Sequence, residues 1–115
     1  MCTRNDVDAI VKKIIETYHH VYSDKLMAVY LYGSYAREDY DDYSDVDIVA
    51  IVDGERKYVQ NQLKMVWDKS SELELEYEVI ISPTAIPYID FATYESILPY
   101  YRNISTEGVR LYESA

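Results

Sequence analysis

Two aspartates separated by one residue, Asp45 and Asp47, are the side chains of this sequence best placed to do chemistry. They open the run DVDIVAIV (45–52), which predicts a β-strand, so both side chains leave the same face of a sheet with backbones about 7 Å apart. Neighbouring carboxylates repel each other, and a divalent cation compensates that repulsion. Mg²⁺ is expected, because it keeps several water ligands and leaves room for substrate phosphates.

A second feature, the pair Gly33 and Ser34, directly follows the apolar run LMAVYLY (26–32). A glycine after a buried strand lets the backbone approach a ligand closely, and a serine that opens a short helix offers its hydroxyl to phosphate oxygens. Arg37, one helical turn further, could face the same pocket and neutralise phosphate charge. The sequence therefore predicts an anion site beside a cation site.

These segments must be positioned by the elements around them. Residues 6–23 place apolar side chains at helical spacing, and the short apolar runs 26–32 and 45–52 predict buried strands. Residues 55–70 predict a second long helix with Trp67 in the core. The remaining expected elements are a third strand in LELEYEVIIS (73–82), a short helix near 91–98, a turn or helix near 100–107, and an edge strand in VRLY after Gly108.

Helices that alternate with three or four strands predict a compact α/β or α+β fold, with a small mixed sheet flanked by helices. A length of 115 residues, 49% of them apolar, suits one domain over 1–115 with one core. The net charge of −10 disfavours direct binding to nucleic acid or to an anionic membrane. With no apolar run near the roughly 20 residues that span a bilayer, and no signal region at the start, we expect a cytoplasmic protein.

The spacing of the site residues resembles a known motif. Gly33-Ser34, then ten residues, then Asp45-Val46-Asp47, with Ala36-Arg37 and Ser44 between them, is similar to the GSx10DxD motif of the DNA polymerase β-like nucleotidyltransferase superfamily. The best agreement is with its minimal nucleotidyltransferases, small single-domain proteins with the pattern GSxARxxxxxxSDxD. The motif spans fifteen residues, and the expected order of helices and strands agrees over most of the chain.

The resemblance implies a polymerase β-like nucleotidyltransferase fold and an enzyme that joins a nucleoside monophosphate, most often AMP from ATP, to an acceptor hydroxyl. It implies that Gly33 and Ser34 hold the phosphates of the nucleoside triphosphate and that Asp45 and Asp47 hold Mg²⁺. The metal would neutralise charge on the α-phosphate and on the departing pyrophosphate.

The family also carries a third carboxylate, on a strand next to the Asp-x-Asp strand. The expected strand 73–82 contains no aspartate, so Glu78 is the favoured third catalytic and metal-binding acid, with Glu76 second. Such an acid could also act as general base for the acceptor hydroxyl. The alternative is that the glutamates of 73–82 form a solvated strand face, in which case catalysis is weak or lost.

Three functions stay open at this point. Minimal nucleotidyltransferases commonly act as antitoxins paired with a helical HEPN ribonuclease toxin, and they can adenylylate a tyrosine of that partner, so the resemblance implies a HEPN-type partner here. The chain could instead be a nucleotide-binding module that neutralises its partner by contact, without turnover. It could also adenylylate a small molecule such as an antibiotic.

Overall fold

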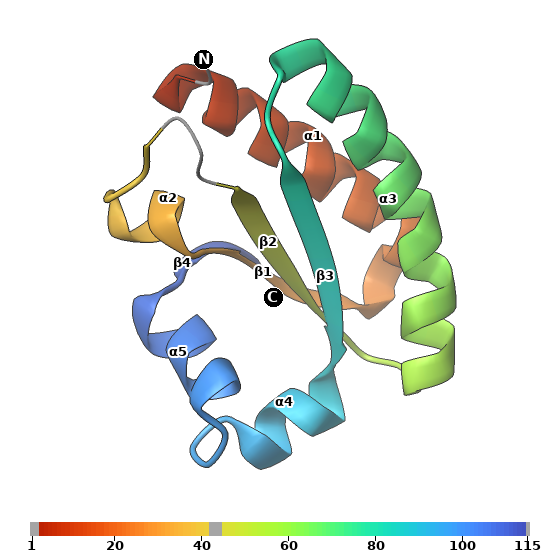
Figure 1. Cartoon of the computed structure of the whole chain (residues 1–115). Helices are drawn as coiled ribbons and strands as arrows, with labels where there is room; N and C mark the ends of the chain where they lie inside the picture. Colours follow the sequence, from red (N-terminus) through yellow and green to blue (C-terminus); the bar gives the residue numbers. More distant parts are fainter. Residues whose placement is uncertain (1–2, 42–44, 115) are drawn as a thin grey trace.

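The computed structural model describes residues 3–41 and 45–114. Its helices are α1 (Arg4–Tyr22), α2 (Ser34–Arg37), α3 (Arg56–Tyr77), α4 (Tyr88–Tyr94) and α5 (Pro99–Glu107), with a short 3-10 turn, η1 (Ser23–Lys25), after α1. Its strands are β1 (Leu26–Tyr32), β2 (Val46–Val52), β3 (Ile81–Pro87) and β4 (Val109–Glu113). The strands form one sheet in the order β3-β2-β1-β4 (Figure 1).

The sheet is mixed, as predicted. β1 pairs antiparallel with β2 and with β4, whereas β2 pairs parallel with β3. A parallel pair needs a long crossover connection, and α3 provides it between β2 and β3. The fold class expected from the sequence is therefore confirmed, including β4 as an edge strand after Gly108.

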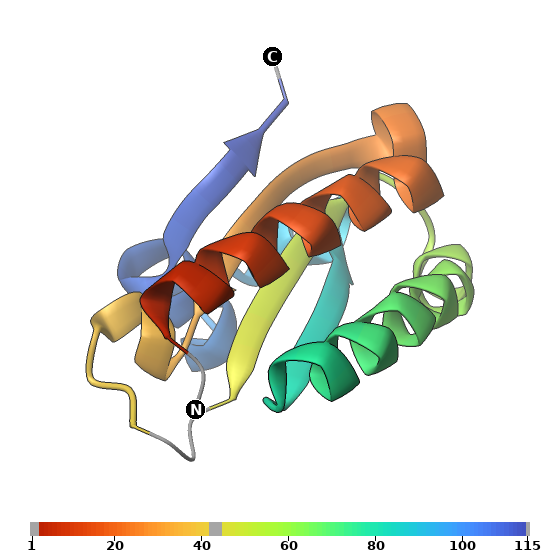
Figure 2. The ribbon, with the colours of Figure 1, turned by 90° about the horizontal axis from the view of Figure 1, so that it is seen from above.

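Helices cover both faces of the sheet (Figure 2). Ile48 and Ala50 of β2 pack in the larger cluster with α1 and α3, whereas Val49 and Ile51 pack in the smaller cluster with α4 and α5. Because side chains alternate along a strand, Asp47 shares the face of Val49. The acidic end of β2 thus belongs to the α4 and α5 side of the sheet.

Helix α1 begins earlier than the apolar pattern indicates, because Thr3 caps it. The Thr3 hydroxyl accepts a hydrogen bond from the Asp6 backbone N–H at 3.1 Å, and the Asp6 carboxylate accepts one from the Thr3 N–H at 3.0 Å. This reciprocal capping satisfies two N–H groups that a helix start leaves without partners. No helix in the described ranges is both long and apolar enough to cross a bilayer.

Tyr18 ties α1 to the central strands and gives a test of the packing. Its fully buried hydroxyl donates to the Thr84 carbonyl at 2.8 Å and lies 3.3 Å from the Ile48 carbonyl. Tyr18→Phe should lower the free energy of unfolding by about 1–2 kcal/mol, because the Thr84 carbonyl loses its hydroxyl donor. Urea denaturation measures this change. Tyr88→Phe, exposed on α4, is the matched control, and equal stability of the two variants would contradict the assignment.

The expected strand over 73–82 is wrong. Its first half continues α3 to Tyr77, and β3 begins only at Ile81. Leu73 is buried while Leu75 is 84% exposed, so the alternating leucines do not share a buried strand face. Leucine and glutamate are strong helix formers, and that propensity, together with packing of α3 along the sheet, prevails over the alternation.

Other differences are smaller. Trp67, expected in the core, is 47% exposed, and its indole N–H donates to the Pro83 carbonyl of edge strand β3 at 3.1 Å. The helix expected near 91–98 begins and ends earlier, as α4, because Pro87 ends β3 and caps the helix directly. The turn or helix expected near 100–107 is a helix, α5.

Candidate functional site

Gly33 and Asp47 lie against each other where β1 ends and β2 begins. The antiparallel register pairs Tyr32 with Asp47, which brings the next residue, Gly33, beside the carboxylate. A β-carbon built on Gly33 would lie 2.6 Å from Asp47 Oδ2. Gly33 also has φ 76° and ψ −151°, a conformation that is essentially restricted to glycine. Both the backbone and the neighbouring carboxylate therefore require glycine here.

Ser34 begins the one-turn helix α2, as predicted. The Gly33 carbonyl accepts hydrogen bonds from the N–H groups of Ala36 and Arg37, each at 3.1 Å. This tight turn makes the chain leave β1 sharply, so α2 and the start of β2 lie at the same corner of the sheet (Figure 1). Ser44, the motif residue just before Asp45, lies outside the described residues.

Asp45 and Arg37 both affect the pKa of the Asp47 carboxyl. Burial raises the pKa of the half-buried Asp47 carboxyl, and the negative charge of Asp45 raises it further. The Arg37 guanidinium opposes both effects and lowers that pKa. Arg37 also forms an exposed ion pair with Asp39, with 3.2 Å between Nε and Oδ2. The structure thus brings Asp45, Asp47 and Arg37 together beside Gly33.

The two aspartates suit a divalent cation. A partly desolvated carboxylate beside a second one is unfavourable without a counter-ion, and Mg²⁺ is commonly held by one or two carboxylates plus water and substrate phosphates. Within residues 3–41 and 45–114, no three His, Cys, Asp or Glu side chains are grouped so that they could hold one metal ion. The remaining ligands would then come from water and from a bound nucleotide.

Glu78, the predicted third acid, does not lie on the strand beside β2, and within residues 3–41 and 45–114 it forms no three-carboxylate cluster with Asp45 and Asp47. It follows the last residue of α3 in a left-handed conformation, with φ 54°, and is exposed. Glu76, the second candidate, lies on α3 with its carboxylate 3.6 Å from Lys13 Nζ. Glu74 accepts a hydrogen bond from the Ile81 N–H at 2.9 Å. The alternative of one solvated strand face is also wrong, because these glutamates belong to a helix and its end.

The strand that does lie beside Asp47 carries hydroxyl side chains. In the parallel register, Ser82 of β3 pairs with Asp47, and Thr84 pairs with Val49. Sequence reasoning missed both residues because it placed the third strand too early. The segment SPTAIP has no alternation that marks a strand, and its two prolines argue against one.

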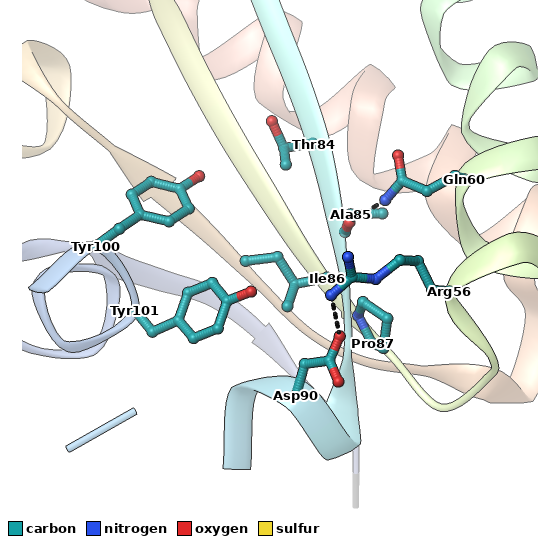
Figure 3. A pocket seen from close by; sticks show the side chains of 9 residues that line it. All are labelled: Arg56, Gln60, Thr84, Ala85, Ile86, Pro87, Asp90, Tyr100 and Tyr101. Atoms are coloured by element: carbon teal, nitrogen blue, oxygen red, sulfur yellow. Dashed lines mark hydrogen bonds and ion pairs between the residues drawn. The ribbon is translucent and has the colours of Figure 1, made fainter. Parts of the chain in front are cut away.

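A pocket of about 400 Å³ lies on the same side of the sheet, between β3, the start of α3 and the segment of α4 and α5 (Figure 3). Arg56 and Asp90 form an ion pair across it, with 3.0 Å between Nη2 and Oδ2. The Gln60 amide donates to the Ala85 carbonyl at 2.9 Å. The lining residues are Arg56, Gln60, Thr84, Ala85, Ile86, Pro87, Asp90, Tyr100 and Tyr101.

Tyr100 connects this pocket to the aspartates. Its ring packs edge-to-face on Tyr32, with 5.8 Å between centroids, and Tyr32 pairs with Asp47. Burial raises the pKa of the Tyr100 phenol, and the neighbouring Tyr32 and Asp47 raise it further. Tyr100, which lines the pocket, is therefore close enough to Asp47 for the two groups to interact electrostatically.

Residues 10–112, which include this whole corner, match the protein family described as "Nucleotidyltransferase domain". The chain belongs to the nucleotidyltransferase family. This nucleotidyltransferase is similar to two proteins of Methanocaldococcus jannaschii, MJ0141 and MJ0604, both named as candidate protein adenylyltransferases. It is 36% identical to MJ0141 over 68% of this chain and 77% of that protein. It is 28% identical to MJ0604 over 89% of this chain and 94% of that protein.

The nucleotidyltransferase fold is also found among solved structures. A chain of the toxin–antitoxin complex MntA–HpeT superimposes with a TM-score of 0.55 at 17% identity, covering 90% of this chain and 73% of that one. A toxin–antitoxin structure with AMP-PNP gives a TM-score of 0.55 at 19% identity with the same coverage. The resemblance to minimal nucleotidyltransferases, drawn from the motif, is confirmed.

Proposed function

We propose that this nucleotidyltransferase transfers AMP from ATP to a hydroxyl group of a partner protein, using Mg²⁺ held by Asp45 and Asp47. The observation that carries the proposal is the contact of the Asp47 carboxylate with Gly33, next to a second carboxylate. The names of the two Methanocaldococcus jannaschii relatives support a protein acceptor and the adenylyl group. AMP-PNP in one structural neighbour supports a nucleoside triphosphate as substrate.

Each residue at the corner has a part in this proposal. Gly33, which has no side chain, lets phosphate oxygens approach the backbone, and the Ser34 hydroxyl donates to one of them. Arg37 offsets negative charge on the phosphates. When bound, Mg²⁺ would stabilise the charge that develops on the α-phosphate and the leaving pyrophosphate. The protein thus acts mainly by positioning groups and stabilising charge.

The hydroxyl side chains of β3 indicate which kind of acceptor group suits this site. Ser82 and Thr84 stand on the strand beside Asp47, and neither hydroxyl is a base at neutral pH. An acceptor that loses its proton readily is then favoured. A tyrosine phenol, with a pKa of about 10, ionises far more readily than an aliphatic hydroxyl, which is about as weakly acidic as water. We therefore favour a tyrosine of the partner as acceptor.

We further propose that the partner is a HEPN-type helical toxin and that this chain is its antitoxin. The structural similarity to a chain of a toxin–antitoxin complex supports this role. The net charge of −10 suits a basic protein surface. A contact-only module is the second candidate, because the described residues supply no third carboxylate to the site.

One labelling experiment separates these functions. The purified chain is incubated with Mg²⁺, ATP labelled at the α-phosphate, and the product of the adjacent gene. We expect label on the partner protein, lost when EDTA removes the metal. A tight complex without label would support the contact-only module. Label on an aminoglycoside added instead of the protein would support a small-molecule acceptor.

A further inference from the structure

The proposed reaction fixes the direction from which the acceptor arrives. In an in-line displacement at phosphorus, the attacking oxygen and the leaving group lie on opposite sides. With the triphosphate at Gly33 and Ser34, the pyrophosphate leaves on the β1 side of Asp47. Because the sheet order is β3-β2-β1, the attacking oxygen must approach from the β3 side.

We propose that the pocket on the β3 side receives the acceptor side chain, and that the neighbouring surface of α4 and α5 docks the protein that carries it. This inference rests on the function proposed above and adds where the acceptor binds. The acceptor oxygen would form a bond to the α-phosphorus of ATP as the bond to pyrophosphate breaks, and its proton would pass to solvent.

The pocket suits a side chain with a flat apolar body and a polar tip. The rings of Tyr100 and Tyr101 form one wall, and Arg56 and Gln60 lie opposite them (Figure 3). Tyr100 is 44% exposed and also packs on Tyr32 at the aspartate corner. A side chain that enters along the tyrosines is therefore directed toward Asp47.

The surface beside the pocket indicates that the acceptor is a protein. The segment 88–98 exposes five large apolar side chains, and the exposed Tyr100 lines the pocket. The exposed side chains are Tyr88 (45%), Ile89 (69%), Tyr94 (43%), Ile97 (66%) and Leu98 (43%). A small acceptor would leave them in water, whereas a docked protein would cover them.

Charge at the edge of this surface specifies the partner further. Asp53 and Glu55 line a second hollow together with Tyr88 and Ile89. The apolar surface therefore has an acidic border, within a chain of net charge −10. The complementary partner surface is apolar at its centre with lysine or arginine around it.

Two probes separate the pocket from the docking surface. The first is N-acetyl-L-tyrosinamide, which can fill only the pocket. The second is a peptide with one tyrosine flanked by leucines and lysines, which can also cover α4 and α5. Transfer of AMP from ATP with Mg²⁺ is measured by mass spectrometry. The peptide should have a KM at least about tenfold lower, and replacing its lysines by glutamates should remove that advantage.

Variants then assign each part. Tyr101→Ala should raise the KM for both probes about tenfold while the KM for ATP changes less than about twofold. Ile97→Ser should raise the KM for the peptide alone. His20 lies in a hollow lined by α1 and α3 on the other face of the sheet. His20→Ala is therefore the matched control and should leave the KM for ATP and for both probes unchanged. A rise in the KM for ATP alone in Tyr101→Ala would place the nucleoside in the pocket and overturn the inference.

Binding decides the matter if neither probe is adenylylated. In ¹H–¹⁵N spectra, AMP-PNP with Mg²⁺ should shift the amide signals of Gly33 and Asp47. If these signals do not shift, the proposed function is refuted, whatever the tyrosine probe does. N-acetyl-L-tyrosinamide should shift the signals of Thr84 and Tyr101. If AMP-PNP binds but no pocket signal responds to the tyrosine probe, the acceptor pocket is wrong.

Discussion

Gly33→Ala is expected to lower kcat/KM for nucleotidyl transfer by at least about 100-fold, because a shift of about 1 Å in a catalytic group has an effect of that size. The new methyl group would lie 2.6 Å from Asp47 Oδ2, so the carboxylate has to move. The same change forces alanine into φ 76° and ψ −151°, which destabilises the fold by about 1–3 kcal/mol. Steady-state kinetics and urea denaturation measure the two effects.

Gly54→Ala is the matched control for that substitution. Gly54 also lies in a turn, but its backbone has no positive φ. A β-carbon there would meet the ring of Tyr58 at 3.0 Å, the movable end of a side chain. We expect a loss of stability below about 1 kcal/mol and unchanged transfer to N-acetyl-L-tyrosinamide, an acceptor too small to use the docking surface. If Gly33→Ala behaved in the same way, the close contact with Asp47 would have no role in catalysis.

The meeting of Gly33 and Asp47 at one corner of the sheet could be predicted because its signals are local. Gly33 and Ser34 stop an apolar run, and Asp45 and Asp47 start the next, so strand, turn and strand follow from neighbouring residues. Pairing of the two strands then places the acids beside the glycine without further information. The motif match depends on the same local spacing.

The β3 side of the site could not be predicted in this way. The segment LELEY alternates like a strand, yet it is the last part of α3, since helix propensity and packing decide between two periods in a short segment. Because β3 begins later than expected, Glu78 lies at the end of α3, and Ser82 is the residue that pairs with Asp47. The pocket joins Arg56, Asp90 and Tyr100, which are far apart in sequence and have no shared motif.

Asp47→Asn should abolish transfer while making the metal-free fold more stable, a combination that a purely structural residue would not show. The amide is a poor Mg²⁺ ligand. Removing a residue that only supports a metal ligand costs up to about 100-fold in activity, so replacing a ligand itself should lower kcat/KM by at least about 100-fold. Neutralising a half-buried acid next to Asp45 should raise the free energy of unfolding at pH 7 by up to about 1 kcal/mol, a modest value because solvent screens the pair.

The pH dependence of the stability gain in Asp47→Asn follows from the raised pKa of Asp47. Because burial and Asp45 raise the pKa of Asp47 in the folded protein, its protonated form favours folding. That contribution is complete below the ordinary value of 3.8 and is lost as the pH rises through the raised folded pKa. The advantage of Asp47→Asn in urea denaturation should therefore be largest at pH 7 and shrink toward pH 4. Asp68→Asn, exposed on α3 and outside this corner, is the matched control and should leave transfer unchanged. Unfolding of Asp47→Asn at pH 7 would instead mean that the carboxylate holds the corner together, and its role toward a metal would have to be abandoned.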